Sequence, residues 1–284
     1  MVFSQLMPDG SPDPRFGQEG GVWASSRSGA TRVALRPDGG FLVGAFKQKV
    51  GTGRTDDGGL FSVKSRGGRD RDFGPGESPG SITIAGAPHK PSYVFDVEVL
   101  RGGRILATGT AKDRLLLMRL QADGSPDRSF GKSGRIILLP GGKKATLAAI
   151  SRDMERDRKG RIVLAGFVYP RDAAKADYGL IMRFRKNGRL DRSFGSNGSV
   201  RLYATPRKGE ERSTRLYDLT IDPKGGIWVA GSAGRSARDG RHAIVARLLP
   251  NGRKDRRFFK KGLLKIKLGE GSTGSAVLRE GQKI

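Results

Sequence analysis

The sequence contains no cysteine, only two histidines and no apolar run approaching the roughly 18 residues that a membrane-spanning helix needs. Without cysteine the chain has no disulfide, no thiolate metal ligand and no thiol nucleophile. His89 and His242 lie far apart and show no ligand spacing typical of a zinc site. We therefore expect no metal ion, no cofactor, no enzymatic activity and no membrane span.

Acidic residues are also scarce. The chain has 28 Asp and Glu against 54 Lys and Arg, which gives a formal net charge of +26. Such a charge produces a positive field that attracts nucleic acid, other acidic polymers or anionic lipid surfaces. The basic residues are scattered along the whole chain, whereas a nucleic-acid site usually concentrates them on one face. Charge alone leaves two interpretations open, a generally basic surface and a polyanion-binding rim.

One segment is repeated five times. Its clearest copy runs from Asp123 to Gly134 and reads DGSPDRSFGKSG. Six residues before the phenylalanine of each copy stands a glycine, and three before it an aspartate. We call each copy an anchor. The anchor phenylalanines are 57 residues apart in the first three copies and 64 apart in the last three: Phe16, Phe73, Phe130, Phe194 and Phe258. Such a nearly fixed period is typical of a repeat protein.

Between two anchors, short apolar runs alternate with turn residues. In the unit that contains Phe130, the runs 94–100, 104–109, 114–120 and 134–139 predict four short strands. Glycine-rich turns separate these runs, and glycine permits the positive φ angles of tight hairpins. Each unit is therefore predicted to be a four-stranded antiparallel meander.

The unit that follows differs in the length of its turns and loops. We expect a strand at 147–150 and then a longer turn that ends at Gly160. Three segments carry basic residues and glycine but little apolar surface: 46–58, 167–177 and 232–241. We expect exposed, mobile loops there.

A unit of four short strands cannot bury both of its faces alone, so it has to stack against copies of itself. Arrangement of the copies around an axis also protects the strand edges, and this arrangement is the β-propeller. We therefore predict an all-β fold, a single propeller with four-stranded antiparallel blades. The predicted blades are 27–86, 87–140, 141–204 and 205–269, and a fifth blade is shared between 1–26 and 270–284.

The two ends of the chain leave a second interpretation open. Residues 1–26 correspond to the last half of a unit and residues 270–284 to its beginning, so together they complete a ring of five blades. The sequence is also compatible with a segment of a longer array. Its first ten residues lack the basic start and apolar core of a signal peptide, and in a longer precursor such a signal would precede Met1.

These segments resemble the delta-60 repeat family, bacterial proteins with tandem copies of a pattern close to DG-x-LD-x-SFG-x-x-G and a preceding strand close to DGKILVAG. Residues 123–134 and 188–198 match the first pattern, and residues 160–166 and 225–231 match the strand. The repeats are also similar to those of NHL-type propellers. The resemblance implies a β-propeller that is often exported or surface-associated, and it implies no catalytic residues.

Two anchors depart from the family pattern. After Phe73, Glu77 takes the place of the later glycine and Gly80 follows instead. Phe258 is followed by Phe259 rather than by glycine. We expect both departures to change a loop and not the fold.

The anchor aspartates are the most regular polar residues of the chain: Asp13, Asp70, Asp127, Asp191 and Asp255. A carboxylate in a turn accepts hydrogen bonds from backbone N–H groups one or two residues further on and so fixes the reversal. A residue that recurs in every unit serves the scaffold rather than one reaction, and we interpret all five as structural turn residues. Eleven residues before the phenylalanine, Arg119, Arg183 and Arg247 recur with a side chain suited to pairing with them.

The best candidate for a binding site lies on the first strands of the units. Asp96 and Asp218 stand at corresponding positions, and Tyr217 directly precedes the second. If first strands line a central channel, as in propellers, these carboxylates converge on a cation or a basic ligand. The alternative is that they are solvated or paired with Arg32, which holds the corresponding position in the first blade.

Together these features predict a non-catalytic, monomeric β-propeller scaffold that binds an unidentified protein, glycan or small ligand and is exported or surface-associated in its full-length form. The alternative function is binding of nucleic acid or another polyanion through a basic rim. A third function is that of a propeller lyase or hydrolase that uses Asp96 and Asp218.

Overall fold

The computed structural model describes residues 2–23, 28–47, 56–74, 79–87, 90–140, 147–170, 177–204, 213–234, 242–259, 262–267 and 273–277. The chain divides into two compact parts, Met1–Ile137 and Leu138–Ile284, each longer than one repeat. From here on these two parts are called the first and second unit, and each is described by itself. The described residues form strands and turns and no α-helix. Among them, accordingly, no helix has the length and hydrophobicity to cross a membrane.

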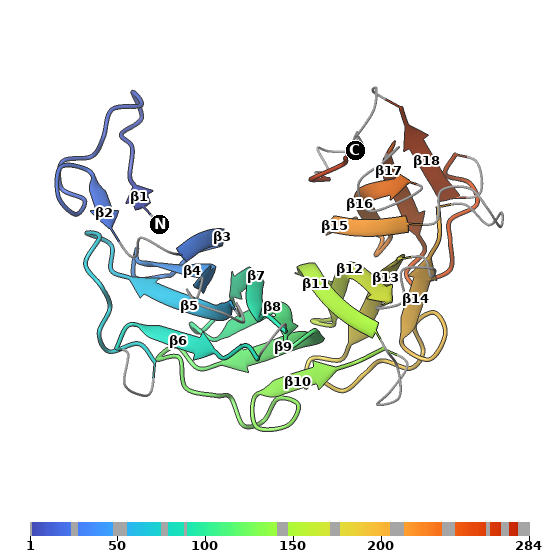
Figure 1. The fold of residues 1–284 in the computed structure, drawn as a ribbon, viewed down its shortest axis with the longest axis horizontal. Helices are drawn as coiled ribbons and strands as arrows, with labels where there is room; N and C mark the ends of the chain where they lie inside the picture. Colours follow the sequence, from blue (N-terminus) through green and yellow to red (C-terminus); the bar gives the residue numbers. More distant parts are fainter. Residues whose placement is uncertain are drawn as a thin grey trace. The chain divides into compact units, whose positions relative to one another are not determined.

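The first unit contains two four-stranded antiparallel sheets (Figure 1). In both sheets consecutive strands are neighbours, with the orders β3-β4-β5-β6 and β7-β8-β9-β10. The strands are β3 (Ser28–Leu35), β4 (Phe41–Lys47), β5 (Asp57–Val63), β6 (Ser81–Ile84), β7 (Tyr93–Val99), β8 (Ile105–Ala111), β9 (Arg114–Leu120) and β10 (Arg135–Leu138).

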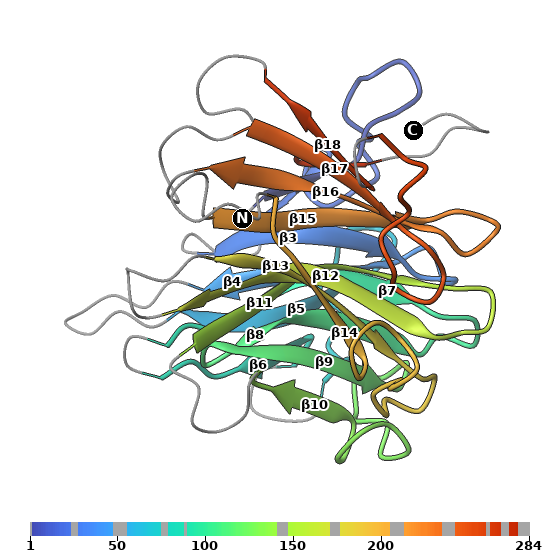
Figure 2. The same cartoon turned by 90° about the vertical axis from the view of Figure 1, so that its right-hand side faces the viewer.

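The second unit repeats this arrangement with the orders β11-β12-β13-β14 and β15-β16-β17-β18 (Figure 2). The strands are β11 (Leu147–Arg156), β12 (Ile162–Pro170), β13 (Tyr178–Phe184), β14 (Ser199–Leu202), β15 (Ser213–Ile221), β16 (Ile227–Gly234), β17 (His242–Leu248) and β18 (Leu263–Ile266). The all-β prediction is confirmed, and four-stranded antiparallel sheets of this kind are consistent with the blades of a propeller.

The prediction of five blades goes beyond what the described residues show, which is four such sheets. At the N-terminus, β1 (Val2–Ser4) and β2 (Gly21–Trp23) form only a two-stranded sheet. Of the C-terminal half blade, 270–284, the structure describes residues 273–277, and these form no strand. The single propeller domain and its blade boundaries stay predictions.

The predicted turn between residue 150 and Gly160 is wrong, because β11 continues to Arg156 and the turn occupies only residues 157–160. The strand continues through charged residues since these find partners on β15. The backbone N–H of Leu219 donates to Asp153 Oδ2 at 2.8 Å, so the carboxylate replaces water with a protein donor.

Strands also extend into the three predicted loops. β5 begins at Asp57, β12 runs to Pro170 and β16 runs to Gly234. Phe167 and Val168 are buried, contrary to the expected exposure of that loop. The remaining loop segments, 48–55, 171–176 and 235–241, lie outside the described residues.

In each unit the hydrophobic core lies between neighbouring sheets. In the first unit, Leu42, Leu60 and Phe73 of the first sheet pack in one cluster with Val94 and Leu116 of the second. The second unit has an equivalent cluster that joins its two sheets and includes Phe194. Stacking of neighbouring sheets within a unit thus buries the faces that one four-stranded sheet leaves open.

Within each unit an anchor links one sheet to the next. The N–H of Gly74 donates to the carbonyl oxygen of Asp123 at 2.7 Å, and the N–H of Gly195 donates to that of Asn251 at 2.8 Å. The Phe73 ring lies against Gly124, where an added Cβ would meet it at 2.9 Å. Gly124 also has a φ of +84°, so both the backbone and the neighbouring ring require glycine there.

We expect Gly124→Ala to destabilise the protein more than Gly102→Ala. Both glycines have a φ of +84°, but a Cβ at Gly102 meets no atom within 4 Å. Both substitutions therefore cost about 1 kcal/mol for the left-handed conformation. Gly124→Ala costs a further ~1 to 3 kcal/mol because the new methyl overpacks the contact with Phe73.

Urea denaturation of the two variants beside the parent chain measures this difference. Equal losses of unfolding free energy would show that the ring contact between the sheets contributes nothing.

Candidate functional site

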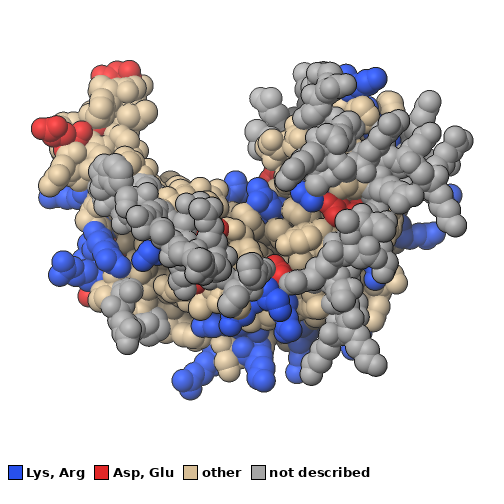
Figure 3. All heavy atoms as spheres, in the orientation of Figure 1, with Lys and Arg blue, Asp and Glu red and all other residues tan. Residues whose placement is uncertain are grey.

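Basic side chains are widespread on the surface. Figure 3 shows Lys and Arg on both units, and it shows acidic side chains at the tip of the segment between β1 and β2. Basic charge alone therefore does not mark a site, and a candidate site is sought where charged side chains stay accessible in the fold.

All five anchors have the same backbone hydrogen bonds. In the anchor of Phe130, the N–H of Asp127 donates to the carbonyl oxygen of Arg119 at 3.0 Å, and the N–H of Phe130 donates to that of Asp127 at 3.0 Å. The equivalent pairs in the other four anchors have distances of 2.8 to 3.1 Å. In four anchors one carboxylate oxygen accepts the backbone N–H two residues on, from Arg15, Ser129, Ser193 and Arg257.

The second carboxylate oxygen accepts from the residue eight positions earlier. Arg119 Nε lies 2.7 Å from Asp127 Oδ2, Arg183 Nε lies 2.8 Å from Asp191 Oδ2 and Arg247 Nη1 lies 2.9 Å from Asp255 Oδ2. Ser62 takes this place beside Asp70 at 2.9 Å, and Gln5 beside Asp13 at 3.5 Å. The predicted structural aspartates thus lie in their turns. The scaffold uses both oxygens of four of them, and Oδ2 of Asp70.

We call the arginines that pair with the anchor aspartates the inner arginines. Two of them, Arg119 and Arg183, also contact the anchor rings. The Arg119 guanidinium carbon lies 4.7 Å from the centre of the Phe130 ring, and that of Arg183 lies 4.6 Å from the centre of the Phe194 ring. A guanidinium over an aromatic face is stabilised by the ring quadrupole. Carboxylate, guanidinium and ring therefore form one unit in each of these anchors.

The anchor environment favours the ionised form of Asp127 and Asp191. Burial alone would raise the pKa of Asp191, but the hydrogen bond from Ser193 and the charge of Arg183 outweigh burial and hold the pKa below its ordinary value. The pKa of Asp127 is lowered in the same way, against burial, by Ser129 and Arg119. A carboxyl group whose pKa is lowered in this way is a poor proton donor at neutral pH.

We expect the protein to lose stability in acid because of these anchors. A folded pKa below the unfolded value contributes stability above the unfolded pKa, and this stability is lost as the pH falls below about 4. Asp191→Asn should flatten this part of the pH profile. At pH 7 it should cost about 3 kcal/mol, because Arg183 is 3% exposed and loses its charged partner.

Unfolding free energies measured between pH 7 and pH 2.5 for both proteins check this. An unchanged acid slope in Asp191→Asn would contradict the assignment.

The candidate binding residues lie beside a β-bulge that recurs in the first strand of every sheet. The register shifts between Ala30 and Arg32 in β3 and between Val94 and Asp96 in β7. Arg32 Nε lies 2.6 Å from Asp96 Oδ1, and Asp96 is 4% exposed. The two residues therefore form an ion pair between neighbouring first strands, which is the alternative that the sequence left open.

Asp218 and Tyr217 lie at the same bulge in β15 of the second unit. The N–H of Val277 donates to Asp218 Oδ2 at 2.6 Å, and the Tyr217 hydroxyl lies 3.3 Å from Ser232 Oγ. The Arg152 guanidinium carbon lies 5.7 Å from the centre of the Tyr217 ring. Both first-strand acids thus contact neighbouring segments of their own unit, and their convergence on one ligand stays a prediction.

The sequence analysis missed a third member of this set. Asp153 follows the bulge of β11 and is 3% exposed. It stands 57 residues after Asp96, one repeat period, so counting along the repeat was sufficient to find it. The wrong turn prediction for residues 151–159 hid this position.

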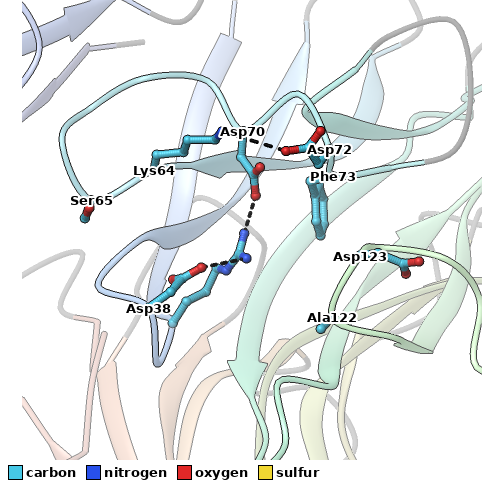
Figure 4. A pocket seen from close by; sticks show the side chains of 9 residues that line it. Asp38, Lys64, Ser65, Asp70, Asp72, Phe73, Ala122 and Asp123 are labelled. Atoms are coloured by element: carbon cyan, nitrogen blue, oxygen red, sulfur yellow. Dashed lines mark hydrogen bonds and ion pairs between the residues drawn. The ribbon is translucent and has the colours of Figure 1, made fainter.

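A pocket of about 510 Å³ lies between the turns of the two sheets of the first unit (Figure 4). It is lined by Arg36, Asp38, Lys64, Ser65, Asp70, Asp72, Phe73, Ala122 and Asp123. Arg36 Nη2 lies 2.8 Å from Asp38 Oδ2, and Lys64 Nζ lies 3.8 Å from Asp72 Oδ2. Asp72 and Asp123 are exposed, so the pocket has accessible acids in an otherwise basic protein.

No sequence motif indicated this pocket. Its residues come from three turns, and the contact between the Phe73 and Asp123 anchors brings the turns together. Among the described residues, no group of three or more His, Asp or Glu is arranged to hold a metal ion.

Two short glycine patterns that the sequence analysis passed over match the spacings of known catalytic or nucleotide motifs. Residues 76–80 read Gly-Glu-Ser-Pro-Gly, and residues 269–274 read Gly-Glu-Gly-Ser-Thr-Gly. The nucleophile elbow and the dinucleotide fingerprint both require a helix directly after the motif. Residue 80 instead leads into β6, and residues 273–277 are irregular; the other parts of both patterns lie largely outside the described residues.

Residues 103–130 match a family model described as a domain of unknown function (DUF5122) beta-propeller. The matched segment contains β8, β9 and the anchor up to Phe130. None of the curated proteins compared with the chain matches it. The short match supports a propeller repeat, while the resemblance to delta-60 repeats in particular stays a prediction.

Proposed function

We propose that the chain is a non-catalytic β-propeller scaffold that binds a protein or small ligand. The observation that carries this proposal is that the fold itself occupies the carboxylates of the anchor aspartates. Both oxygens of the anchor carboxylates of Asp127 and Asp191 are engaged by backbone N–H groups and inner arginines, and their pKa values are lowered. These residues serve the fold in each unit and are poorly suited to proton transfer.

The pocket of the first unit supports a binding role. Its exposed carboxylates, Asp72 and Asp123, favour a ligand with an ammonium or guanidinium group. The Phe73 ring in its wall is 1% exposed and is held by the anchor, so this wall is already formed. A lysine or arginine side chain of a peptide fits this chemistry.

Asp123→Asn combined with Asp72→Asn should weaken the binding of Lys- or Arg-containing peptides by roughly 5- to 30-fold, since each partly solvated charge contributes about 0.5 to 1 kcal/mol. Isothermal titration with short basic, neutral and acidic peptides measures the effect. Asp9→Asn is the matched control, because Asp9 and Asp123 make the same turn hydrogen bond to a residue two positions on, but only Asp123 lines the pocket.

The proposed scaffold loses its support if the parent chain binds none of these peptides and no other ligand of a broad panel. Equal weakening by the control would place the binding outside the pocket.

The proposed propeller has five blades, the fifth being shared between residues 1–26 and 270–284. Two observations support it, one from each unit. In the second unit, Val277 donates its N–H to Asp218 just as Leu219 donates to Asp153, which is the contact that a further first strand would make. In the first unit, Val33 and Leu35 of β3 are 51% and 76% exposed. In contrast, Leu219 of β15, which corresponds to Val33, is 4% exposed.

If a fifth blade covers β3, a thiol at Leu35→Cys should react slowly with a maleimide. The parent chain has no cysteine, so the label reports this position alone. Ile137→Cys is the control, since Ile137 is 49% exposed and lies in β10. Deletion of residues 270–284 should raise the labelling rate of Leu35→Cys to that of the control. Equal rates in the undeleted chain would rule out this closure.

The exported or surface-associated location rests on the family resemblance alone. Detection of the full-length protein in cell fractions with an antibody tests it. The third function, a lyase or hydrolase that uses Asp96 and Asp218, gains no support from the ion pair of Asp96 with Arg32 or from the backbone contact of Asp218.

A further inference from the structure

The turns at one end of the sheets of the second unit form a basic surface. In a meander of four strands, the first and third turns lie at the same end, as Figure 2 shows for this unit. We call this end the basic turn surface and define it by residues 157–161, 185–198, 222–226 and 249–259. Turns of this surface contact one another: Arg161 Nη1 lies 3.6 Å from Asp191 Oδ2, and the N–H of Gly195 donates to the carbonyl oxygen of Asn251 at 2.8 Å.

The acids of these turns point inward. Asp191, Asp222 and Asp255 are 4%, 8% and 5% exposed, and the side chain of Asp157 is 10% exposed. Each is paired with an arginine: Asp191 with Arg183, Asp222 and Asp255 with Arg247, and Asp157 with Arg161. Among the described residues of the basic turn surface no Asp or Glu is exposed.

The basic side chains of the same turns are exposed. They include Arg158, Lys159, Arg185, Lys186, Arg189, Arg192, Lys224, Arg253, Arg256 and Arg257. The turns of the first unit differ, because they expose Asp38, Asp72 and Asp123 among their basic residues. The second unit therefore concentrates positive charge on one end, which the scattered sequence pattern did not indicate.

The turn forms with either a neutral asparagine or a charged aspartate at the same position. Seven residues before the phenylalanine, Asp9 and Asp123 accept the backbone N–H of the residue two positions on, at 2.9 and 2.8 Å. In the second unit Asn187 and Asn251 make the same hydrogen bond at 3.1 and 3.0 Å. Asparagine thus supplies the oxygen without the negative charge.

The next variable position of the turn changes in the same direction. Where the first unit has Ser125, the second unit has Arg189 and Arg253, and both arginines are exposed. The sequence Asp-Gly-Ser of residues 123–125 is thereby replaced by Asn-Gly-Arg at 187–189 and 251–253. Each replacement adds two units of positive charge to a turn whose backbone N–H hydrogen bond stays the same.

We propose that the basic turn surface binds the phosphodiester backbone of a nucleic acid without reading its sequence. This inference rests on the proposed non-catalytic binding function and names a second ligand class at a second site. The charges lie on four successive turns, so they suit an extended polymer with regularly spaced anions rather than a single small anion. Exposed arginines predominate, and the guanidinium fork matches the oxygens of a phosphate. Contacts to phosphates give affinity that does not depend on base sequence.

The test is a titration of the full chain against a labelled 24-base-pair DNA duplex and an RNA duplex of the same sequence, followed by fluorescence anisotropy from 50 to 300 mM NaCl. We expect log Kd to rise linearly with log salt, because phosphate contacts release condensed counterions. Binding of either duplex supports the proposal, and the two arms tell which backbone is preferred.

The informative variant combines N187D, R189S, N251D and R253S, which converts both turns to the Asp-Gly-Ser of residues 123–125. The fold should persist, because the first unit forms the same turn with these residues. Two arginines that contact phosphates are lost, so the salt slope should become smaller by about two. Affinity at 100 mM NaCl should fall at least about tenfold, since two aspartates add repulsion of the phosphates.

The control combines K90E and R114E, two exposed residues of the first unit that lie outside the basic turn surface. In the four-residue variant, each of the two turns loses one positive charge and gains one negative charge, so the net charge falls by four. The control lowers the net charge by the same four units. We expect the control to keep the salt slope of the parent chain.

Equal weakening by both variants would overturn the proposal, because it would show attraction to net charge and not to this surface. Absence of binding to both duplexes, or binding to anionic vesicles without binding to a duplex, would also overturn it. If duplex binding fails while basic peptides still bind in the pocket of the first unit, only this inference falls. If the chain binds neither, the proposed scaffold function falls as well.

Discussion

The buried carboxylate of the anchor turn is the interaction on which the rest of the structure depends. It accepts a backbone N–H of its own turn and a side-chain donor from the third strand, as Asp127 does with Ser129 and Arg119. In the second unit Arg183 pairs with Asp191 in the same way and covers the Phe194 ring, which packs in the cluster shared with the neighbouring sheet of that unit. One charged group thereby fixes a turn, a strand partner and the position of the largest apolar side chain.

This arrangement explains why the anchor aspartates of a strongly basic chain are buried. A buried carboxylate is stable only when its charge is paired and its oxygens accept hydrogen bonds. The anchors meet both conditions, with Arg183 and Asp191 3% and 5% exposed at the side chain. Most basic side chains are left to the surface.

The regular part of the fold could be predicted from the sequence, because the anchors impose their geometry locally. Spacing and turn residues located the strands of the four sheets and the recurrent Asp and Arg positions that meet in the turns. The extent of β11 could not be predicted in this way. Its residues Asp153 and Glu155 look like turn residues, but they become strand residues when Leu219 and Ile221 of the neighbouring sheet donate hydrogen bonds to them. Such partners lie one repeat away and leave no local signal.

The candidate sites show the same limit. The sequence placed Asp96 and Arg32 at corresponding first-strand positions, and the structure joins them in an ion pair. It gave no indication of the pocket beside Phe73, which three separate turns create. Nor did it show that the acids of the basic turn surface are buried or half-buried while most of its basic side chains are exposed, because net charge and composition contain no direction.

The contact between successive anchors has a direction. A sheet offers its phenylalanine to the following sheet and receives the preceding ring at its own glycine, as Gly124 receives Phe73 and Gly252 receives Phe194. This head-to-tail contact is the same at the described junction within each unit. Unequal crossing-over between the coding repeats can therefore add or remove a whole repeat and leave each remaining junction chemically intact. We expect the number of repeats to change more freely in evolution than the residues of the junction.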